Sequence, residues 1–106
     1  IDLSYGNYSI INSNISNCGD KGVSTGENSK LEINQLNITD SSIGIASKDG
    51  SHVKATNINI YDTSICFAAY NKKKEFNGSY MHVNKFNCKN FESQTDINTG
   101  SIIEFN

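Results

Sequence analysis

The chain has 106 residues, a formal net charge of −2 and no Arg, and 36% of its residues are hydrophobic. This length predicts one domain, the mildly acidic charge argues against a nucleic-acid-binding protein, and no apolar run is long enough for a membrane-spanning helix. The hydrophobic fraction is below the usual value of about 45–50%, so a single globular core would be thin. The chain begins with Ile1 and shows no signal-peptide pattern, so we expect a segment of a longer protein or a mature form.

A repeat of about 22 residues organises the chain. Leu31 and Ile33 recur as Val53 and Ala55. Internal periods of this length are typical of solenoid proteins, in which each repeat stacks on its neighbour. The equivalent positions in the other repeats are Tyr8 and Ile10, Met81 and Val83, and, at the start of a fifth repeat, Ile103 and Phe105.

Each repeat is built from short stretches separated by turns. In the second repeat, residues 31–33 alternate between apolar and polar, 34–35 form a polar corner, and 36–38 alternate again. An Asp corner at Asp40, the pair Gly44–Ile45 and a Gly-Ser turn at 50–51 follow. Such short alternating pieces predict strands, and their repetition in register predicts a parallel β-solenoid. We therefore predict an all-β fold, a three-faced parallel β-helix of about four to five coils, as a single domain over residues 1–106.

The second corner of each repeat carries Asn or Asp, residues that tolerate left-handed backbone and hydrogen-bond along a stack. We interpret this column as structural. The alternative is that Asp40 and Asp62, one coil apart, form an acidic pair that would bind Ca²⁺ or share a proton. The four corner residues are Asn17, Asp40, Asp62 and Asn90.

A second polar column lies between inward positions and is expected to point outward. Its side chains would form an amide ladder on a flat face, or a row of donors and acceptors for a sugar chain. Its members are Asn14, Asn37, Asn59 and Asn87.

An insertion lengthens the repeat between Ser51 and Ser79, and the extra residues lie within YNKKKEFNG, residues 70–78. Solenoids place insertions in loops on one side and often bind ligands there. Lysines and aromatic rings could together engage an anionic polysaccharide, and the alternative is a solvated lysine loop. The candidate ligand-binding residues are Tyr70, Lys72, Lys73, Lys74, Phe76 and Tyr80.

Three cysteines occupy different columns. Cys88 falls in an inward apolar column, Cys66 falls in the column of Gly22 and Gly44, and Cys18 lies at a corner. We therefore expect no bridge between Cys66 and Cys88, and no spacing resembles a zinc site. The charged residues near the third corner are interpreted as surface residues of little energetic weight; they are Asp20, Lys21, Glu27, Lys48 and Asp49.

The segment ITDSSIGI, residues 38–45, contains the rhythm I-x-[ND]-x-x-x-G-[IV]. It resembles the right-handed parallel β-helix repeats of the pectin-lyase-like superfamily, and the resemblance covers nearly the whole chain. It implies a right-handed β-helix, a fold shared by lyases, hydrolases, tailspikes, adhesins and spacers. Enzymes of that superfamily use acidic residues on neighbouring coils, with Ca²⁺ in the lyases. This chain has neither the Arg base nor the Gly-His-Gly motif expected beside them, and His52 and His82 are isolated.

Two further phrases, GDKGVSTGENS at 19–29 and GIASKDGS at 44–51, are similar to β-helix segments attached to CotH-kinase-like bacterial proteins. Nothing in the chain resembles a kinase nucleotide loop or catalytic motif. The resemblance implies an accessory β-helix beside a kinase-like domain as one alternative.

We expect a non-catalytic module of a bacterial cell-surface or secreted protein, a rigid scaffold that contacts polysaccharide through the lysine loop. The alternative is part of a polysaccharide lyase or hydrolase that uses Asp40 and Asp62. We expect no cofactor, with Ca²⁺ bound only if those two residues act as a pair. The apolar residues Ile103 and Phe105 near the end of the chain predict end-to-end self-association through open strand edges.

Overall fold

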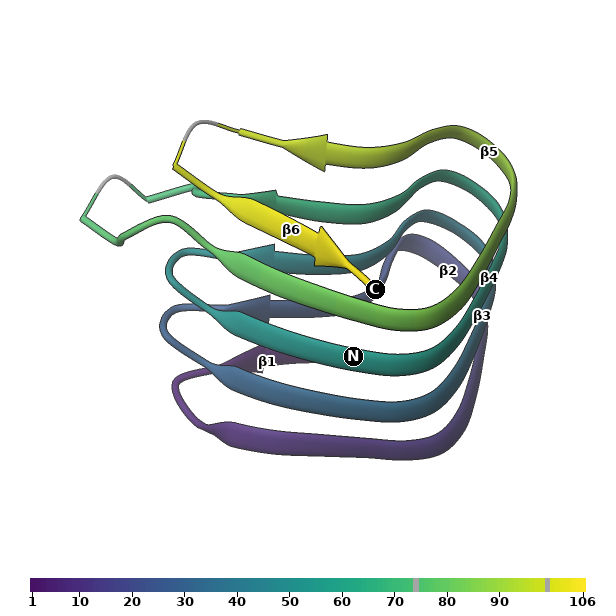
Figure 1. Ribbon diagram of the computed structural model, residues 1–106, viewed down its shortest axis with the longest axis horizontal. Helices are drawn as coiled ribbons and strands as arrows, with labels where there is room; N and C mark the ends of the chain where they lie inside the picture. Colours follow the sequence, from purple (N-terminus) through teal and green to yellow (C-terminus); the bar gives the residue numbers. More distant parts are fainter. Residues whose placement is uncertain (74, 99) are drawn as a thin grey trace.

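A computed structural model describes residues 1–73, 75–98 and 100–106, with residue 18 described by its backbone alone. The strands form one parallel sheet that winds through about five stacked turns, in the order β1 to β6 (Figure 1). No helix is present among the described residues. The predicted parallel β-solenoid is confirmed. Its strands are β1 (Asp2–Ser4), β2 (Asn7–Gly26), β3 (Lys30–Lys48), β4 (His52–Tyr70), β5 (Tyr80–Ile97) and β6 (Ile102–Phe105).

The register of the sheet follows the repeat in the sequence. Leu31 pairs with Val53, which pairs with Met81, and Met81 pairs with Ile103. The longer step between β4 and β5 leaves this register intact, because the extra residues leave the sheet as the loop between the two strands (Figure 1). The inserted loop is therefore an addition to the outside of the solenoid.

Left-handed residues bend each long strand at two corners. The first corner has φ of 70° at Gln35 and 59° at Asn57, and the second has 61° at Asp40 and 59° at Asp62. Asn and Asp adopt this region more readily than other non-glycine residues, so the left-handed backbone expected at the Asn and Asp corner column is confirmed. The remaining corner residues with positive φ are Asn12, Lys85, Asn17 and Asn90.

The interior of the tube is a set of stacked apolar columns. Leu36, Ile38, Ile58 and Ile60 are all fully buried. Burying one such side chain contributes about 1.5–3 kcal/mol, so a few inward residues per turn suffice for a narrow solenoid. Toward the C-terminal end the columns finish in three packed rings, Phe67, Phe86 and Phe105. Phe105 remains 36% exposed, and the end-to-end association of the chain stays a prediction.

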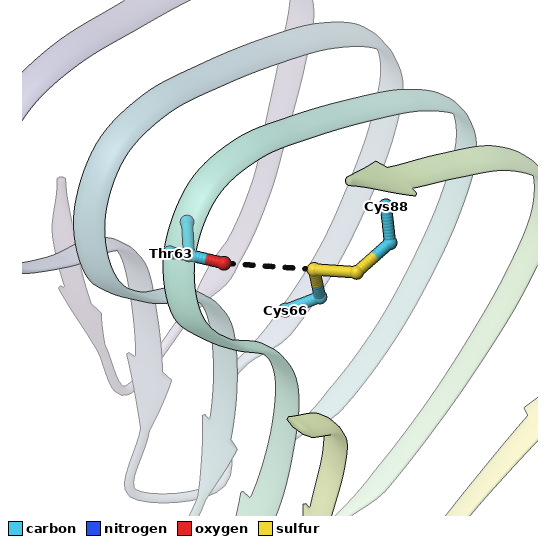
Figure 2. Close-up of a disulfide and its surroundings, with 3 residues drawn as sticks. All are labelled: Thr63, Cys66 and Cys88. Atoms are coloured by element: carbon cyan, nitrogen blue, oxygen red, sulfur yellow. Dashed lines mark hydrogen bonds between the residues drawn. A yellow bond between two sulfur atoms is a disulfide. The ribbon is translucent and has the colours of Figure 1, made fainter. Parts of the chain in front are cut away.

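A disulfide joins Cys66 to Cys88, and the expectation that these residues would not pair was wrong (Figure 2). Their Cα atoms are 6.3 Å apart, within the range of natural disulfides. The two cysteines do belong to different columns, but those columns lie on adjacent sides of a narrow tube. Side chains that point inward from the two sides of a corner can reach each other inside the tube, as these two do. Thr63 Oγ1 also lies 3.6 Å from the Cys66 sulfur. The bridge ties β4 to β5 from the inside.

The predicted amide ladder on the second side is confirmed. Asn37 Nδ2 donates to Asn14 Oδ1 at 2.7 Å, and Asn59 Nδ2 donates to Asn37 Oδ1 at 2.9 Å. Asn87 Nδ2 continues the series to Asn59 Oδ1 at 3.0 Å. Every amide points the same way along the solenoid axis, so the ladder links four successive strands with side-chain hydrogen bonds.

Candidate functional site

The loop after β4 folds back across the turns of earlier coils. We call residues 71–73 and 75–78 the corner strap. Asp49, in the turn after β3, accepts hydrogen bonds at its Oδ1 from the backbone N–H groups of Lys72 at 2.7 Å and Lys73 at 2.8 Å. Within the strap, Asn71 Nδ2 donates to the carbonyl oxygens of Phe76 and Asn77. The strap is thus anchored to the body of the solenoid and to itself.

Two side chains of the strap contact turns that precede β3. Lys73 Nζ lies 2.8 Å from Glu27 Oε2, in the turn after β2, and this hydrogen bond lowers the pKa of the Glu27 carboxyl. The ring of Phe76 lies 6.5 Å, centroid to centroid, from that of Tyr5, in the turn before β2. The strap therefore contacts the turns that follow β1, β2 and β3, although it follows β4 in sequence.

Asp49 is not the surface residue that the sequence analysis expected, because only 2% of it is exposed. Its carboxylate is buried under the strap and is compensated by the two backbone donors. Charge-assisted hydrogen bonds of this kind are stronger than those between neutral groups. Asp49 acts as the attachment point of the strap.

A basic hollow lies at the same corner. Lys21 from β2, Lys48 at the end of β3 and Lys72 in the strap line a hollow of about 390 Å³, and we call these three residues the lysine cluster. Two carboxylates, Asp2 and Asp20, line it as well. The cluster brings together side chains from three successive coils.

One lysine of the cluster is paired. Lys21 Nζ lies 2.7 Å from Asp20 Oδ2. That hydrogen bond raises the pKa of Lys21 and lowers the pKa of Asp20, so both stay charged at neutral pH. The positive charges of Lys72 and Lys48 lower the pKa of Asp20 further. For Lys48 and Lys72, no hydrogen bond or ion pair of the ammonium group is found within the described part of the chain.

The six residues predicted to bind a ligand fall into separate places. Tyr70 ends β4 in register with Lys48, and burial raises the pKa of its hydroxyl. Lys72 lies beside it in the lysine cluster, whereas Lys73 and Phe76 point to Glu27 and Tyr5. Lys74 lies outside the described residues.

Tyr80 lies apart from the strap. Its ring centroid is 5.6 Å from that of His52, on the first side of the solenoid, and both line a hollow of about 570 Å³ together with Lys30 and Lys54. The structure therefore puts Tyr80 on a different surface from Lys72.

The two candidate acidic residues lie in neighbouring coils at the second corner. Asp40 and Asp62 line a polar hollow of about 520 Å³ that Glu92 also lines. Asp62 Oδ1 accepts a hydrogen bond from Asn90 Nδ2 at 3.0 Å. Over residues 1–73, 75–98 and 100–106, no three His, Cys, Asp or Glu side chains gather in a group that could hold a metal ion.

Sequence reasoning missed the contribution of Lys21 and Lys48 to a common hollow with Lys72. The repeat places Lys48 in one column with Gly26 and Tyr70, and this column could have indicated that Lys48 lies near the start of the loop that contains Lys72. Lys21 follows a register shift between Cys18 and Lys21, where an extra residue breaks the count of the repeat. The spatial neighbours of Lys21 could therefore not be predicted from the repeat spacing.

Comparisons with protein-family models, curated proteins and solved structures find no match to this chain. Among the described residues, no helix is long and apolar enough to span a membrane.

Proposed function

We propose that this chain is a non-catalytic scaffold module of a bacterial secreted or cell-surface protein, and that it contacts an acidic polysaccharide through the lysine cluster and the corner strap. The observation that carries the proposal is the convergence of Lys21, Lys48 and Lys72 on one hollow. The pectin-lyase-like rhythm of the repeat is compatible with such a module, since that fold includes adhesins and spacers.

The scaffold part of the proposal rests on how the coils are tied together. The asparagine ladder runs along the second side, the disulfide joins β4 to β5 inside, and the corner strap ties the third corner outside. The ladder and the disulfide both join β4 to β5, and the strap joins the end of β4 to earlier coils, so the coils are linked at several places around the tube. A solenoid linked in this way is suited to hold neighbouring parts of a protein at a fixed distance.

The secreted or surface location is supported by the bridge between Cys66 and Cys88. Disulfides form and persist outside the reducing cytosol. Cys66 is fully buried and Cys88 is partly buried, which limits the access of other thiols to the bridge.

Contact with an acidic polymer is supported by charge and position. The whole chain has a net charge of −2, yet the lysines outnumber the carboxylates that line this hollow. The lysine cluster spans neighbouring coils, whose strands repeat about every 4.8 Å, so a linear polymer lying along the axis would meet several charges. Lysine acts as a point charge on a flexible stem, which suits a flexible polyanion.

Affinity electrophoresis in gels that contain neutral or acidic polysaccharides tests this proposal. We expect an acidic polysaccharide to retard the chain and Lys48→Met/Lys72→Met to abolish the retardation. The matched control, Lys30→Met/Lys54→Met, changes the net charge equally on a different face and should retain it. Equal loss in both variants would mean that only net charge matters and would refute a site at the corner.

A second candidate is a fragment of a polysaccharide lyase or hydrolase that uses Asp40 and Asp62. The hollow shared by these carboxylates favours it. An enzyme of this kind would degrade an acidic polysaccharide, with Ca²⁺ in the lyase version, and would lose that activity in Asp40→Asn.

The role beside a CotH-like kinase domain is a special case of the scaffold proposal, and the gene sequence flanking this segment tests it.

A further inference from the structure

We propose that the lysine cluster is a binding site for one tetrahedral oxyanion, a sulfate or phosphate group carried by the polymer. The inference rests on the site of the proposed function and specifies the chemical group recognised there. It concerns the anion alone, so it can be tested without knowing the polymer.

The three lysines approach the hollow from different coils. Lys21 lies in β2, Lys48 ends β3 and Lys72 follows β4 by two residues. All three side chains line the same hollow, so their ammonium groups can face one compact anion. The hollow, of about 390 Å³, is large enough to hold such a group with part of its hydration shell.

Each lysine is held in place by a different feature. The stem of Lys48 lies over Gly26, where an added Cβ would come within 3.3 Å of Lys48 Cε. The backbone of Lys72 is held by Asp49 at 2.7 Å. The side chain of Lys21 is only 16% exposed and is bonded to Asp20. The side chain of Lys21 and the backbone of Lys72 are therefore held in place before an anion binds, which reduces the entropic cost of binding.

Charge at the site also favours an anion. The ammonium groups of Lys48 and Lys72 have no hydrogen-bonding partner among the described residues, so an incoming oxyanion would not have to displace an ion pair to reach them. Asp20 is the nearest competitor for Lys21, but its side chain is 76% exposed and points largely to solvent. Replacing Asp20 with Asn should therefore strengthen anion binding.

The geometry favours a tetrahedral group over a planar carboxylate. Three separate ammonium groups that line one hollow can each meet a different oxygen of sulfate or phosphate. A carboxylate offers two oxygens in one plane and is matched best by the planar fork of Arg, which this chain lacks. We expect sulfate and phosphate to bind more tightly than acetate at equal ionic strength.

The test is a titration of the 106-residue chain with sodium sulfate, sodium phosphate or sodium acetate at constant ionic strength, followed by amide chemical shifts. We expect saturable shifts around Lys48 and Lys72 with sulfate or phosphate, weakened about tenfold in Lys48→Met or Lys72→Met. Asp20→Asn should bind several-fold tighter, and Lys54→Met should bind like the parent. Ile1 also lines the hollow, and its α-amino group donates to the carbonyl oxygen of Gly22, so every variant keeps the same N-terminus.

Three results would overturn the inference: shifts that are non-saturable or spread over the whole chain, an equal response to acetate, or unchanged binding in both Lys48→Met and Lys72→Met. Circular dichroism of each variant confirms that the solenoid is folded. Inorganic anion binding without retardation by any polysaccharide would support this inference and refute the proposed polymer contact. Retardation by uronic-acid polymers, with no binding of sulfate or phosphate, would support the polymer contact and refute this inference. Comparing the affinities for sulfate and phosphate shows which of the two anions the site prefers.

Discussion

The carboxylate of Asp49 lies 2.7 Å from the backbone nitrogen of Lys72, and this contact joins the turn after β3 to the strap that follows β4. It connects residues 23 positions apart and sets the backbone of one member of the lysine cluster. The strap's other anchors, Glu27 and Tyr5, lie in earlier turns. Asp49 is therefore one of three anchors of the strap, and it is the one that holds the backbone of Lys72.

Asp49→Asn should loosen the strap. The amide keeps an acceptor and tolerates the left-handed backbone of this position, but the charge that strengthens both hydrogen bonds is lost. We expect a loss of about 1 kcal/mol in the free energy of unfolding by urea, with faster amide hydrogen exchange at Lys72 and Lys73. Asp40→Asn, at an exposed left-handed corner, is the control and should change stability by less than about 0.5 kcal/mol. Unchanged exchange at both strap amides would contradict the assigned role.

Removing the bridge with Cys66→Ala/Cys88→Ala should lower the free energy of unfolding by about 2–4 kcal/mol. The loop that it closes is 22 residues long, and its main effect is to restrict the unfolded chain. Urea unfolding with and without a reductant measures this, and the double variant should be insensitive to the reductant. A thiol assay of the denatured, unreduced chain should find one free thiol from the three cysteines, and three would show that the bridge is absent.

The asparagine ladder predicts unequal effects along one column. Asn59 donates to Asn37 and accepts from Asn87, whereas Asn14 only accepts, from Asn37. Asn59→Ala removes two side-chain hydrogen bonds and should cost about 1–3 kcal/mol, and Asn14→Ala should cost about half as much. Thermal unfolding of both variants makes the comparison. Equal, negligible effects would mean that the exposed amides exchange their hydrogen bonds with water at no cost.

Gly44 should not tolerate a side chain. An added Cβ would approach the carbonyl oxygen of Cys66 to 2.6 Å and the Cδ1 atom of Ile60 to 2.7 Å. Overpacking of this kind costs about 1–3 kcal/mol, so Gly44→Ala should unfold at lower urea concentration. Gly19→Ala is the matched control, because nothing lies within 4 Å of its added Cβ. A Gly44→Ala variant as stable as the control would contradict the packing between these coils.

The fold was predictable because each inward column repeats its chemistry in every coil. Leu31 and Val53 are one repeat apart, Met81 follows after the insertion, and the structure pairs all three in parallel register. The left-handed corner at Asp40 was readable for the same reason, since Asn and Asp recur where the backbone needs positive φ.

The sequence-based predictions were wrong or incomplete where contacts join different columns or different loops. Cys66 and Cys88 meet across the inside of a corner, which column-by-column reasoning treats as separate. Asp49 is buried by an insertion whose path is independent of the repeat. Lys21 enters the basic hollow after a register shift, and a local extra residue of that kind is invisible to a fixed period.

Mapping the contact surface of an acidic polysaccharide by amide chemical shifts tests the central claim most directly. The account predicts that perturbed amides cluster at the third corner, over residues 20–28, 47–50 and 70–73, and that Lys48→Met/Lys72→Met removes them. Perturbation centred instead on the first side, around Lys30, His52 and Tyr80, would contradict the assignment of the lysine cluster as the contact site.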